Sequence, residues 1–338
     1  MLTRASASTL PVVDLGVTFA SLPALGTAAA PEVARRAESL GYTSFWVAET
    51  TGAEAFSTLA IAGEAAPSLD LGTGVLALQL RTPMLAAMGA ATLQAAHPDN
   101  DVILGVGISS PVVTERWHGA EYGDRPLAQV REYVTLVKEI LQGESVSFQG
   151  DFYSVSRTRL GVRLGDKRPK VVVGALNEKM LSLAGEVADG VLLNYIPASH
   201  VPWSVDQVRK GGDATIYAYV HAGVAEREHG IDAARRDLFS YAVVDSYAAS
   251  FRRAGFGDEV DAIRAAHEKK DREGALEAVS DRMVDAIDVM GDAAHVRRTV
   301  QEYVDNGVEK PVLMPLPWGP DRMAVVDATL RAAIGADL

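Results

Sequence analysis

Residues 71–79 read LGTGVLALQ and combine the composition of a buried strand with two interior glycines. Their apolar side chains favour the interior of a sheet. Gly72 and Gly74 do not, because glycine in a strand forfeits packing and costs conformational entropy. Glycine inside a strand pattern indicates a bulge, or the close approach of another backbone or a ligand. We therefore expect a buried strand here that a bulge or a close neighbour disturbs.

Outward from this stretch, strand-like runs alternate with helix-like runs along the chain. Pro31 and Pro83 stand where helices begin, and Gly41 and Gly143 stand where helices end. We expect strands over 12–19, 43–48, 71–79, 101–107, 170–173, 191–194, 215–220 and 311–317. Helices are expected over 31–40, 55–65, 83–96, 127–141, 178–186 and most of 232–304, with a hairpin over 146–155.

The number of strands predicts the fold class, which is α/β. Strands that alternate with helices form a parallel sheet, and eight of them close a (β/α)₈ barrel, the TIM barrel. The alternative is a doubly wound open sheet, which usually has fewer strands and a glycine motif after the first strand. No such motif follows Phe19. We predict one barrel domain over residues 1–338, with insertions and a short flexible N-terminus at 1–10.

Composition excludes several classes of function. The chain has 32 Lys and Arg against 44 Asp and Glu, a net charge of −12, which argues against a nucleic-acid-binding surface. With no cysteine, the chain has no disulfide, thiolate metal site or cysteine nucleophile. The most apolar run, 84–96, is shorter than the roughly 20 residues that span a bilayer, so we expect no membrane partner. A cytoplasmic enzyme acting on a small molecule fits these features.

The carboxyl ends of barrel strands carry the active site in this fold. The residues expected there are largely apolar or small, with Asn194, Tyr195 and His221 among the polar ones. We find no spacing typical of a metal site, no obvious Schiff-base lysine and no Ser-His-Asp arrangement. Such a pocket suits a large planar cofactor that brings its own chemistry.

Two strand-to-helix turns are candidates for holding an anion. At 171–180, VVVGALNEKM, the start of a helix would offer free backbone N–H groups, with Asn177 as N-cap and Lys179 adding charge. An ordinary capped loop explains that turn equally well. At 105–110, GVGISS would bring N–H groups and two hydroxyls to the pocket, although it lacks the third glycine of a GxGxxG motif.

The chain resembles the bacterial luciferase-like superfamily, and within it the oxidoreductases that use the deazaflavin coenzyme F420. The segments that carry the resemblance are 34–50, 71–94, 102–111, 125–153 and 171–194. It implies a (β/α)₈ barrel, coenzyme F420 at the strand ends and a homodimer. FMN is the alternative cofactor, because monooxygenases of the same superfamily use the same cleft.

The resemblance also implies where the cofactor lies. In related enzymes the third strand has a bulge with a non-prolyl cis peptide behind the cofactor ring, which corresponds here to Gly74–Val75. The cofactor phosphate would lie at 174–177, and the ring edges near 107–109. Together with the strand-end position of Thr18, the predicted cofactor-binding residues are Thr18, Gly74, Val75, Leu76, Gly107, Ile108, Ser109, Gly174, Ala175, Leu176 and Asn177.

Three residues are candidates for assisting proton transfer: Glu49, Ser110 and His118. Glu49 stands near a position that is often histidine or aspartate in relatives. Ser110 stands where a sugar-phosphate dehydrogenase of the superfamily has a catalytic glutamate. The phosphate-gripping residues of that enzyme have no match here, so the sugar-phosphate activity is not expected.

The predicted reaction is hydride transfer between the deazaflavin and a C=C, C=N or C=O bond of a small organic molecule, with specialised metabolism as the expected setting. The alternatives are an FMN-dependent monooxygenase and a cofactor-free barrel that serves as a binding or partner subunit. Glycines at 74, 107 and 174 argue against the last, because a degenerate site would be filled by bulky or charged side chains.

Overall fold

The computed structural model describes residues 14–336, so the expected flexible segment 1–10 lies outside the described residues. Eight parallel strands form a closed barrel, because the last strand pairs with both the seventh and the first. The barrel strands are β1 (Gly16–Thr18), β2 (Ser44–Val47), β3 (Asp70–Thr73), β5 (Val102–Gly107), β8 (Lys170–Gly174), β9 (Gly190–Leu193), β10 (Thr215–Val224) and β12 (Lys310–Pro315). The predicted (β/α)₈ barrel is confirmed.

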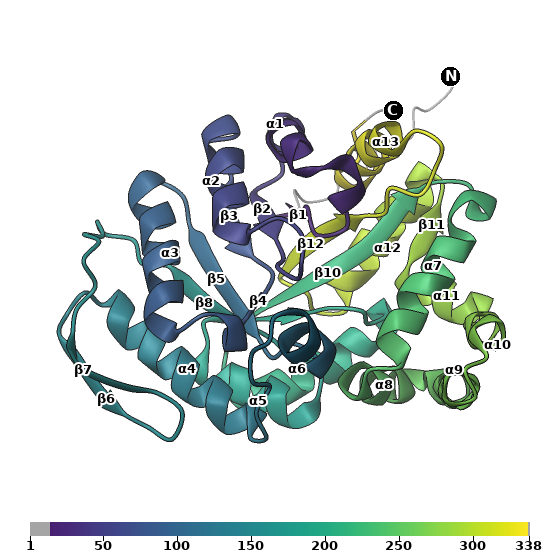
Figure 1. Ribbon diagram of the computed structural model, residues 1–338. Coiled ribbons are helices and arrows are strands. Elements are labelled where there is room, and N and C mark those ends of the chain that lie inside the picture. Colours follow the sequence, from purple (N-terminus) through teal and green to yellow (C-terminus); the bar gives the residue numbers. More distant parts are fainter. Residues whose placement is uncertain (1–13, 337–338) are drawn as a thin grey trace.

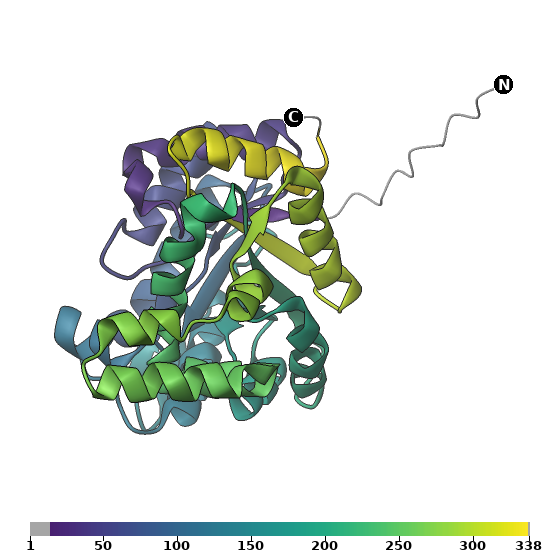
Figure 2. The ribbon, with the colours of Figure 1, turned by 90° about the vertical axis from the view of Figure 1, so that its right-hand side faces the viewer.

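Helices follow the strands and cover the outside of the barrel (Figures 1 and 2). Local chemistry sets where they begin: the Thr82 hydroxyl accepts a hydrogen bond from the Leu85 N–H at 3.2 Å, and Pro83 takes the first position of the next helix. The covering helices are α1 (Ala30–Ser39), α2 (Ala55–Ala65), α3 (Pro83–Ala96), α4 (Pro126–Leu141), α5 (Glu178–Val187), α6 (Val201–Arg209), α12 (Ala293–Asp305) and α13 (Arg322–Ile334). Within residues 14–336, none of the helices has the length and apolar character needed to cross a bilayer.

The barrel interior is filled by large aromatic side chains opposite glycines. Trp46, Tyr217 and Tyr219 belong to the interior cluster, and the ring centroids of Trp46 and Tyr217 are 5.4 Å apart. A Cβ on Gly72 would come within 2.5 Å of the Trp46 indole, and a Cβ on Gly190 within 2.7 Å of the Tyr217 ring. Glycine is therefore required at these positions because a neighbouring aromatic ring occupies the space of a side chain.

The third strand is interrupted, which differs from the continuous strand expected over 71–79. β3 ends at Thr73, the Gly74–Val75 peptide bond is cis, and the short strand β4 (Leu76–Ala77) then pairs with β5. The bond implied by the family resemblance is thus present. Residues 78–80 form a turn of 3₁₀ helix instead of extending the strand.

The neighbour of Gly74 is a side chain of the barrel itself. The Tyr219 hydroxyl donates a hydrogen bond to the Gly74 carbonyl oxygen at 2.7 Å, and the Thr18 hydroxyl lies 3.3 Å from the same Tyr219 oxygen. A Cβ on Gly74 would overlap the Tyr219 hydroxyl. The side chain of Tyr219 therefore holds the interrupted strand in place from inside the barrel.

Two insertions decorate the barrel. The expected hairpin is β6 (Val146–Gln149) with β7 (Ser154–Thr158), and it projects from the side of the barrel opposite the helices of residues 245–277 (Figure 1). The larger insertion follows β10 and has its own hydrophobic core, which includes Leu238, Phe251 and Met283. Its elements are α7 (Arg227–Ala242), α8 (Asp245–Phe251), α9 (Gly257–Glu268), α10 (Arg272–Glu277), α11 (Asp281–Ile287) and β11 (Val289–Gly291).

The sequence expectation of helix through most of 232–304 is wrong at β11. This short strand pairs in parallel with Ala222–Val224 at the end of β10, outside the barrel. Val289 is buried there, so pairing with β10 and burial decide its conformation over local helical spacing.

Gly74→Ala is expected to lower the free energy of unfolding by about 1–3 kcal/mol, because the added methyl overlaps the fully buried Tyr219 side chain. Gly52→Ala is the matched control, since the Cβ of Gly52 would meet nothing within 4 Å. Urea denaturation measures both variants, and Tyr219→Phe in the Gly74→Ala background should recover part of the loss. Equal stability of the two alanine variants would contradict the packing explanation.

Candidate active site

Two cavities open where the barrel strands end, and Gly74 and Asn194 line both of them. The first, here called the glycine-lined cavity, has a volume of about 340 Å³ and lies over the ends of β5 and β8. The second, here called the aromatic cavity, has a volume of about 570 Å³ and lies over the ends of β1, β2 and β12. Because they share two lining residues, the two cavities adjoin at the interruption of the third strand.

The glycine-lined cavity owes its shape to missing side chains. Val75 follows the cis peptide and packs against two glycines on neighbouring strands. A Cβ on Gly107 would lie 3.1 Å from a methyl group of Val75, and one on Gly174 would lie 3.3 Å from it. Side chains at these positions would press on Val75 and narrow the cavity, so the glycines keep a flat, apolar wall open.

Cations gather at the end of this cavity, at the start of α5. Asn177 occupies the N-cap position, but its side chain does not cap the helix as the sequence indicated. It donates to the Ser246 carbonyl oxygen at 3.1 Å and accepts a hydrogen bond from Arg253 instead. Lys179 lines the cavity beside these groups. The first-turn N–H groups of α5 and the two cations together suit an anion such as a phosphate.

Most of the predicted cofactor-binding residues come together in the glycine-lined cavity. Nine of them line it: Gly74, Val75, Gly107, Ile108, Ser109, Gly174, Ala175, Leu176 and Asn177. Thr18 and Leu76 do not. Leu76 is fully buried in the core where β4 pairs with β5, and the hydroxyl of fully buried Thr18 bonds to the Trp46 carbonyl oxygen at 3.2 Å. Thr18 thus contacts Tyr219 beneath the site and does not face either cavity.

The three candidates for proton transfer lie outside the lining of both cavities. Glu49 accepts hydrogen bonds from Arg81 at 2.8 Å and from the Ala55 N–H at 3.1 Å, which joins the end of β2 to the start of α2. Ser110 accepts a hydrogen bond from the Val113 N–H at 3.3 Å, and the His118 ring lies 2.6 Å from the Thr50 carbonyl oxygen. Hydrogen bonds therefore engage all three side chains.

The aromatic cavity holds a carboxyl group that the sequence analysis did not single out. Tyr195, Tyr219, Tyr241 and Trp318 line the cavity, and among its described lining residues Asp237 alone has a carboxyl. Asp237 lies on α7 of the large insertion. The sequence gives little warning of this, because an acidic residue on a charged helical segment is usually solvated.

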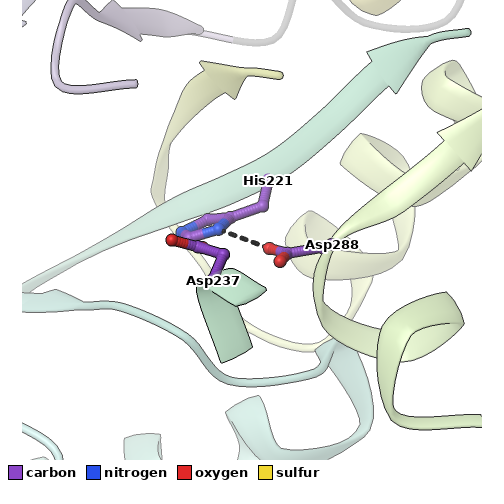
Figure 3. Close-up of side chains that lie close together, drawn as sticks. All are labelled: His221, Asp237 and Asp288. Atoms are coloured by element: carbon purple, nitrogen blue, oxygen red, sulfur yellow. Dashed lines mark hydrogen bonds and ion pairs between the residues drawn. The ribbon is translucent and has the colours of Figure 1, made fainter. Parts of the chain in front are cut away.

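Half-buried Asp237 lies beside two fully buried polar groups, His221 on β10 and Asp288 ahead of β11 (Figure 3). Ligand atoms of the three side chains lie within 4.8 Å of one another. His221 Nδ1 is 2.9 Å from Asp288 Oδ1, and His221 Nε2 is 2.8 Å from Asn194 Oδ1. Only His221 was visible as a strand-end residue, since tertiary packing of the insertion supplies both carboxyls.

Burial decides the protonation of this cluster. It raises the pKa of Asp288 to about 8 and lowers the pKa of His221 to about 4. Near neutral pH the pair is therefore uncharged, with the Asp288 carboxyl donating to His221 Nδ1. Burial also raises the pKa of Asp237 to about 7, while a hydrogen bond from Tyr195 opposes that rise.

Comparison with known proteins places the chain in a family. A family model described as luciferase-like monooxygenase matches residues 14–310, and the chain belongs to this family. A Mycobacterium tuberculosis protein whose name assigns it to the coenzyme F420-dependent oxidoreductases is 28% identical over 311 residues, covering 83% of this chain and 89% of that protein. The 5,10-methylenetetrahydromethanopterin reductase of Archaeoglobus fulgidus is 27% identical over 304 residues, covering 85% and 89%.

A solved structure agrees with the fold. The coenzyme F420-dependent tetrahydromethanopterin reductase of Methanopyrus kandleri superposes with a TM-score of 0.79, covering 96% of this chain and 99% of that one at 20% identity. The chain therefore has the barrel of a luciferase-like protein. Of the relatives named here, two are described as coenzyme F420-dependent, and the Archaeoglobus fulgidus protein is described as a reductase.

Glu49→Gln is expected to lower the free energy of unfolding by about 1–3 kcal/mol, because Glu49 is the more buried of the two carboxylates that pair with Arg81, and its charge-assisted hydrogen bonds are lost. The matched control is Glu186→Gln, which breaks an exposed ion pair with Arg131 and should cost no more than about 1 kcal/mol. Thermal denaturation of both variants measures the difference. If Glu49→Gln loses no more stability than Glu186→Gln, Glu49 does not stabilise the junction between the end of β2 and the start of α2.

Asp288→Asn is expected to flatten the dependence of stability on pH. Because the folded-state pKa of Asp288 is raised to about 8, folding favours the protonated acid, and stability is lost as pH rises from about 4 to about 8. The neutral amide of asparagine imitates the protonated acid and cannot ionise. In the variant, the unfolding free energy should therefore fall less steeply with pH, by up to about 1.4 kcal/mol per pH unit. Urea denaturation across this pH range measures the effect, with the exposed Asp232→Asn variant as control. If Asp288 were ionised throughout, Asp288→Asn would leave the dependence of the unfolding free energy on pH unchanged.

Proposed function

We propose that this protein is an oxidoreductase that uses coenzyme F420 and reduces a C=C, C=N or C=O bond of a small organic molecule. The observation that carries the proposal is the glycine-lined cavity, in which nine predicted cofactor-binding residues meet at the interrupted third strand. Family membership and the names of the relatives support the same coenzyme. When bound, the reduced deazaflavin supplies a hydride.

The residues of this cavity fit such a coenzyme. Gly107 and Gly174 leave room against Val75 for a flat ring, since a Cβ at either of them would crowd the Val75 side chain. Lys179 and the first turn of α5 would hold a phosphate, and Arg253 would support it through Asn177. The aromatic cavity adjoins the same strand interruption and would receive an apolar or aromatic substrate.

An FMN-dependent monooxygenase is the second candidate, and the description of the matching family model favours it. Both coenzymes would use the glycine-lined cavity. The two functions are therefore distinguished by comparing the affinity of the protein for coenzyme F420 with its affinity for FMN. A cofactor-free binding subunit is disfavoured, because its cavity would be filled and this one is open. The homodimer implied by the family resemblance stays a prediction.

Titration of the purified protein with coenzyme F420, followed by quenching of coenzyme fluorescence, is expected to show saturable binding. Lys179→Gln should weaken it about 5- to 30-fold, because one charge-assisted contact to phosphate is worth about 1–2 kcal/mol. Lys210→Gln is the control: Lys210 pairs with Glu178 at 3.3 Å outside the cavity lining.

Two results would contradict the proposal. Tight binding of reduced FMN with oxygen consumption, and no affinity for the deazaflavin, would favour the monooxygenase. Equal loss of coenzyme affinity in Lys179→Gln and Lys210→Gln would show that the coenzyme phosphate does not bind at the start of α5.

A further inference from the structure

Among the lining residues of the aromatic cavity that the structure describes, Asp237 has the single carboxyl group, and its neighbours hold it firmly. Tyr195 donates its hydroxyl hydrogen to Asp237 Oδ2 at 2.7 Å. The Tyr195 ring packs against Tyr241 with centroids 3.8 Å apart and against the edge of His221 at 4.3 Å. Tyr195 adopts a positive φ of 51°, and its N–H donates to Asn194 Oδ1 at 2.9 Å. Such a locked arrangement orients a reacting group.

The hydrogen bonds below Asp237 establish where the protons lie. Because Asn194 Oδ1 already accepts the Tyr195 N–H, this oxygen is also the acceptor for the His221 Nε2–H at 2.8 Å. His221 Nδ1 is then left to share one proton with Asp288 Oδ1 at 2.9 Å. The buried pair thus carries the Nε2–H and one shared proton and has no net charge, so it gives Asp237 neither a counter-ion nor a base.

This geometry suits a proton better than a metal ion. A separation of 2.9 Å between Nδ1 and Oδ1 is the length of a direct hydrogen bond. Asp237 Oδ2 is also occupied by the Tyr195 hydroxyl. Among the described residues the cluster has three ligand groups, but its close contacts are already hydrogen-bonded. We therefore interpret the cluster of His221, Asp237 and Asp288 as a group of hydrogen-bonded side chains that hold protons, and not as a metal site.

We propose that Asp237 is the general acid of the reaction, delivering a proton to the heteroatom of a carbonyl or imine substrate in the aromatic cavity. The role rests on the proposed function. A hydride from the coenzyme adds to the carbon of the C=O or C=N bond, the π electrons move to oxygen or nitrogen, and the Asp237 proton bonds to that atom. Asp237 becomes a carboxylate and takes its next proton from water. Tyr195 is the positioning residue.

The surroundings of Asp237 favour holding that proton near neutral pH. The titratable groups that face it are Tyr195 after β9, His221 on β10, Tyr241 on α7, Tyr247 on α8 and Asp288 ahead of β11. The three tyrosines and Asp288 cannot carry a positive charge, and burial keeps His221 uncharged. Burial of Asp237 is therefore not offset by a nearby cation, which suits a general acid.

The first test needs no coenzyme. In infrared spectra of the purified protein, the C=O stretch of a protonated carboxyl should disappear with a midpoint near pH 7. Asp237→Asn should remove this band, and the exposed control Asp232→Asn on the same helix should keep it. Tyr195→Phe should raise the midpoint, because its hydroxyl stabilises the carboxylate. A spectrum without a band assignable to Asp237 above pH 5 would overturn the proposal.

The second test uses the holoenzyme with benzaldehyde, cyclohexenone and 1-pyrroline as probes. Asp237→Asn should lower turnover of an accepted probe about 10²-fold or more, with coenzyme affinity unchanged, whereas Asp232→Asn should change neither. The pH profile of turnover should fall above the infrared midpoint, and Tyr195→Phe should shift that fall upward.

The outcomes separate the two claims. Absence of coenzyme binding in the unaltered protein would overturn the proposed function, and the catalytic role with it, whatever the infrared titration shows. Coenzyme binding with full turnover by Asp237→Asn would overturn the role of Asp237 alone. Reduction of none of the three probes, or a stoichiometric divalent metal lost in Asp237→Asn, would also overturn the assignment.

Discussion

The packing of aromatic side chains against glycines inside the barrel is the constraint on which the rest of the structure depends. Trp46, Tyr217 and Tyr219 are too large for a barrel interior with full-sized neighbours, and Gly72, Gly74 and Gly190 supply the missing space. Tyr219 also donates to the Gly74 carbonyl oxygen at the point where the third strand is interrupted. The interruption turns Val75 toward Gly107 and Gly174, and the glycine-lined cavity forms around it.

The two cavities divide the chemistry between them. The glycine-lined cavity has apolar walls, backbone N–H groups and cations at one end, which are binding features. The aromatic cavity has the carboxyl of Asp237 above an uncharged histidine–aspartate pair, which is the arrangement that the proposed general acid needs. The large insertion brings Asp237 to the barrel, so the segment between β10 and β12 supplies a side chain of this cavity as well as a second core.

The sequence predicted the fold well because barrel strands and their helices carry strong local signals. Val171, Val172 and Val173 could only be a buried strand, and the prolines and glycines at helix ends located the helices. Nine of the residues that the family resemblance singled out also line one cavity, because glycines at neighbouring strand ends leave space there. The sequence prediction was wrong at β11, where pairing with β10 overrides local helical spacing. Glu49, Ser110 and His118 were chosen by position in the chain. Contacts distant in sequence engage Glu49 and His118, and Ser110 accepts a hydrogen bond from the Val113 N–H three residues further on.

The sequence by itself determined the eightfold alternation of strands and helices, the absence of cysteine chemistry and the positions of the glycines. These properties belong to residue types and their spacing, which folding cannot change. Tertiary structure alone decided that Tyr219 is the neighbour of Gly74, that Leu76 faces the core, and that Asp237 and Asp288 meet His221. Each of these contacts joins residues far apart in the chain. They arise because closing the barrel and docking the insertion bury polar groups together, and burial sets which of them hold protons.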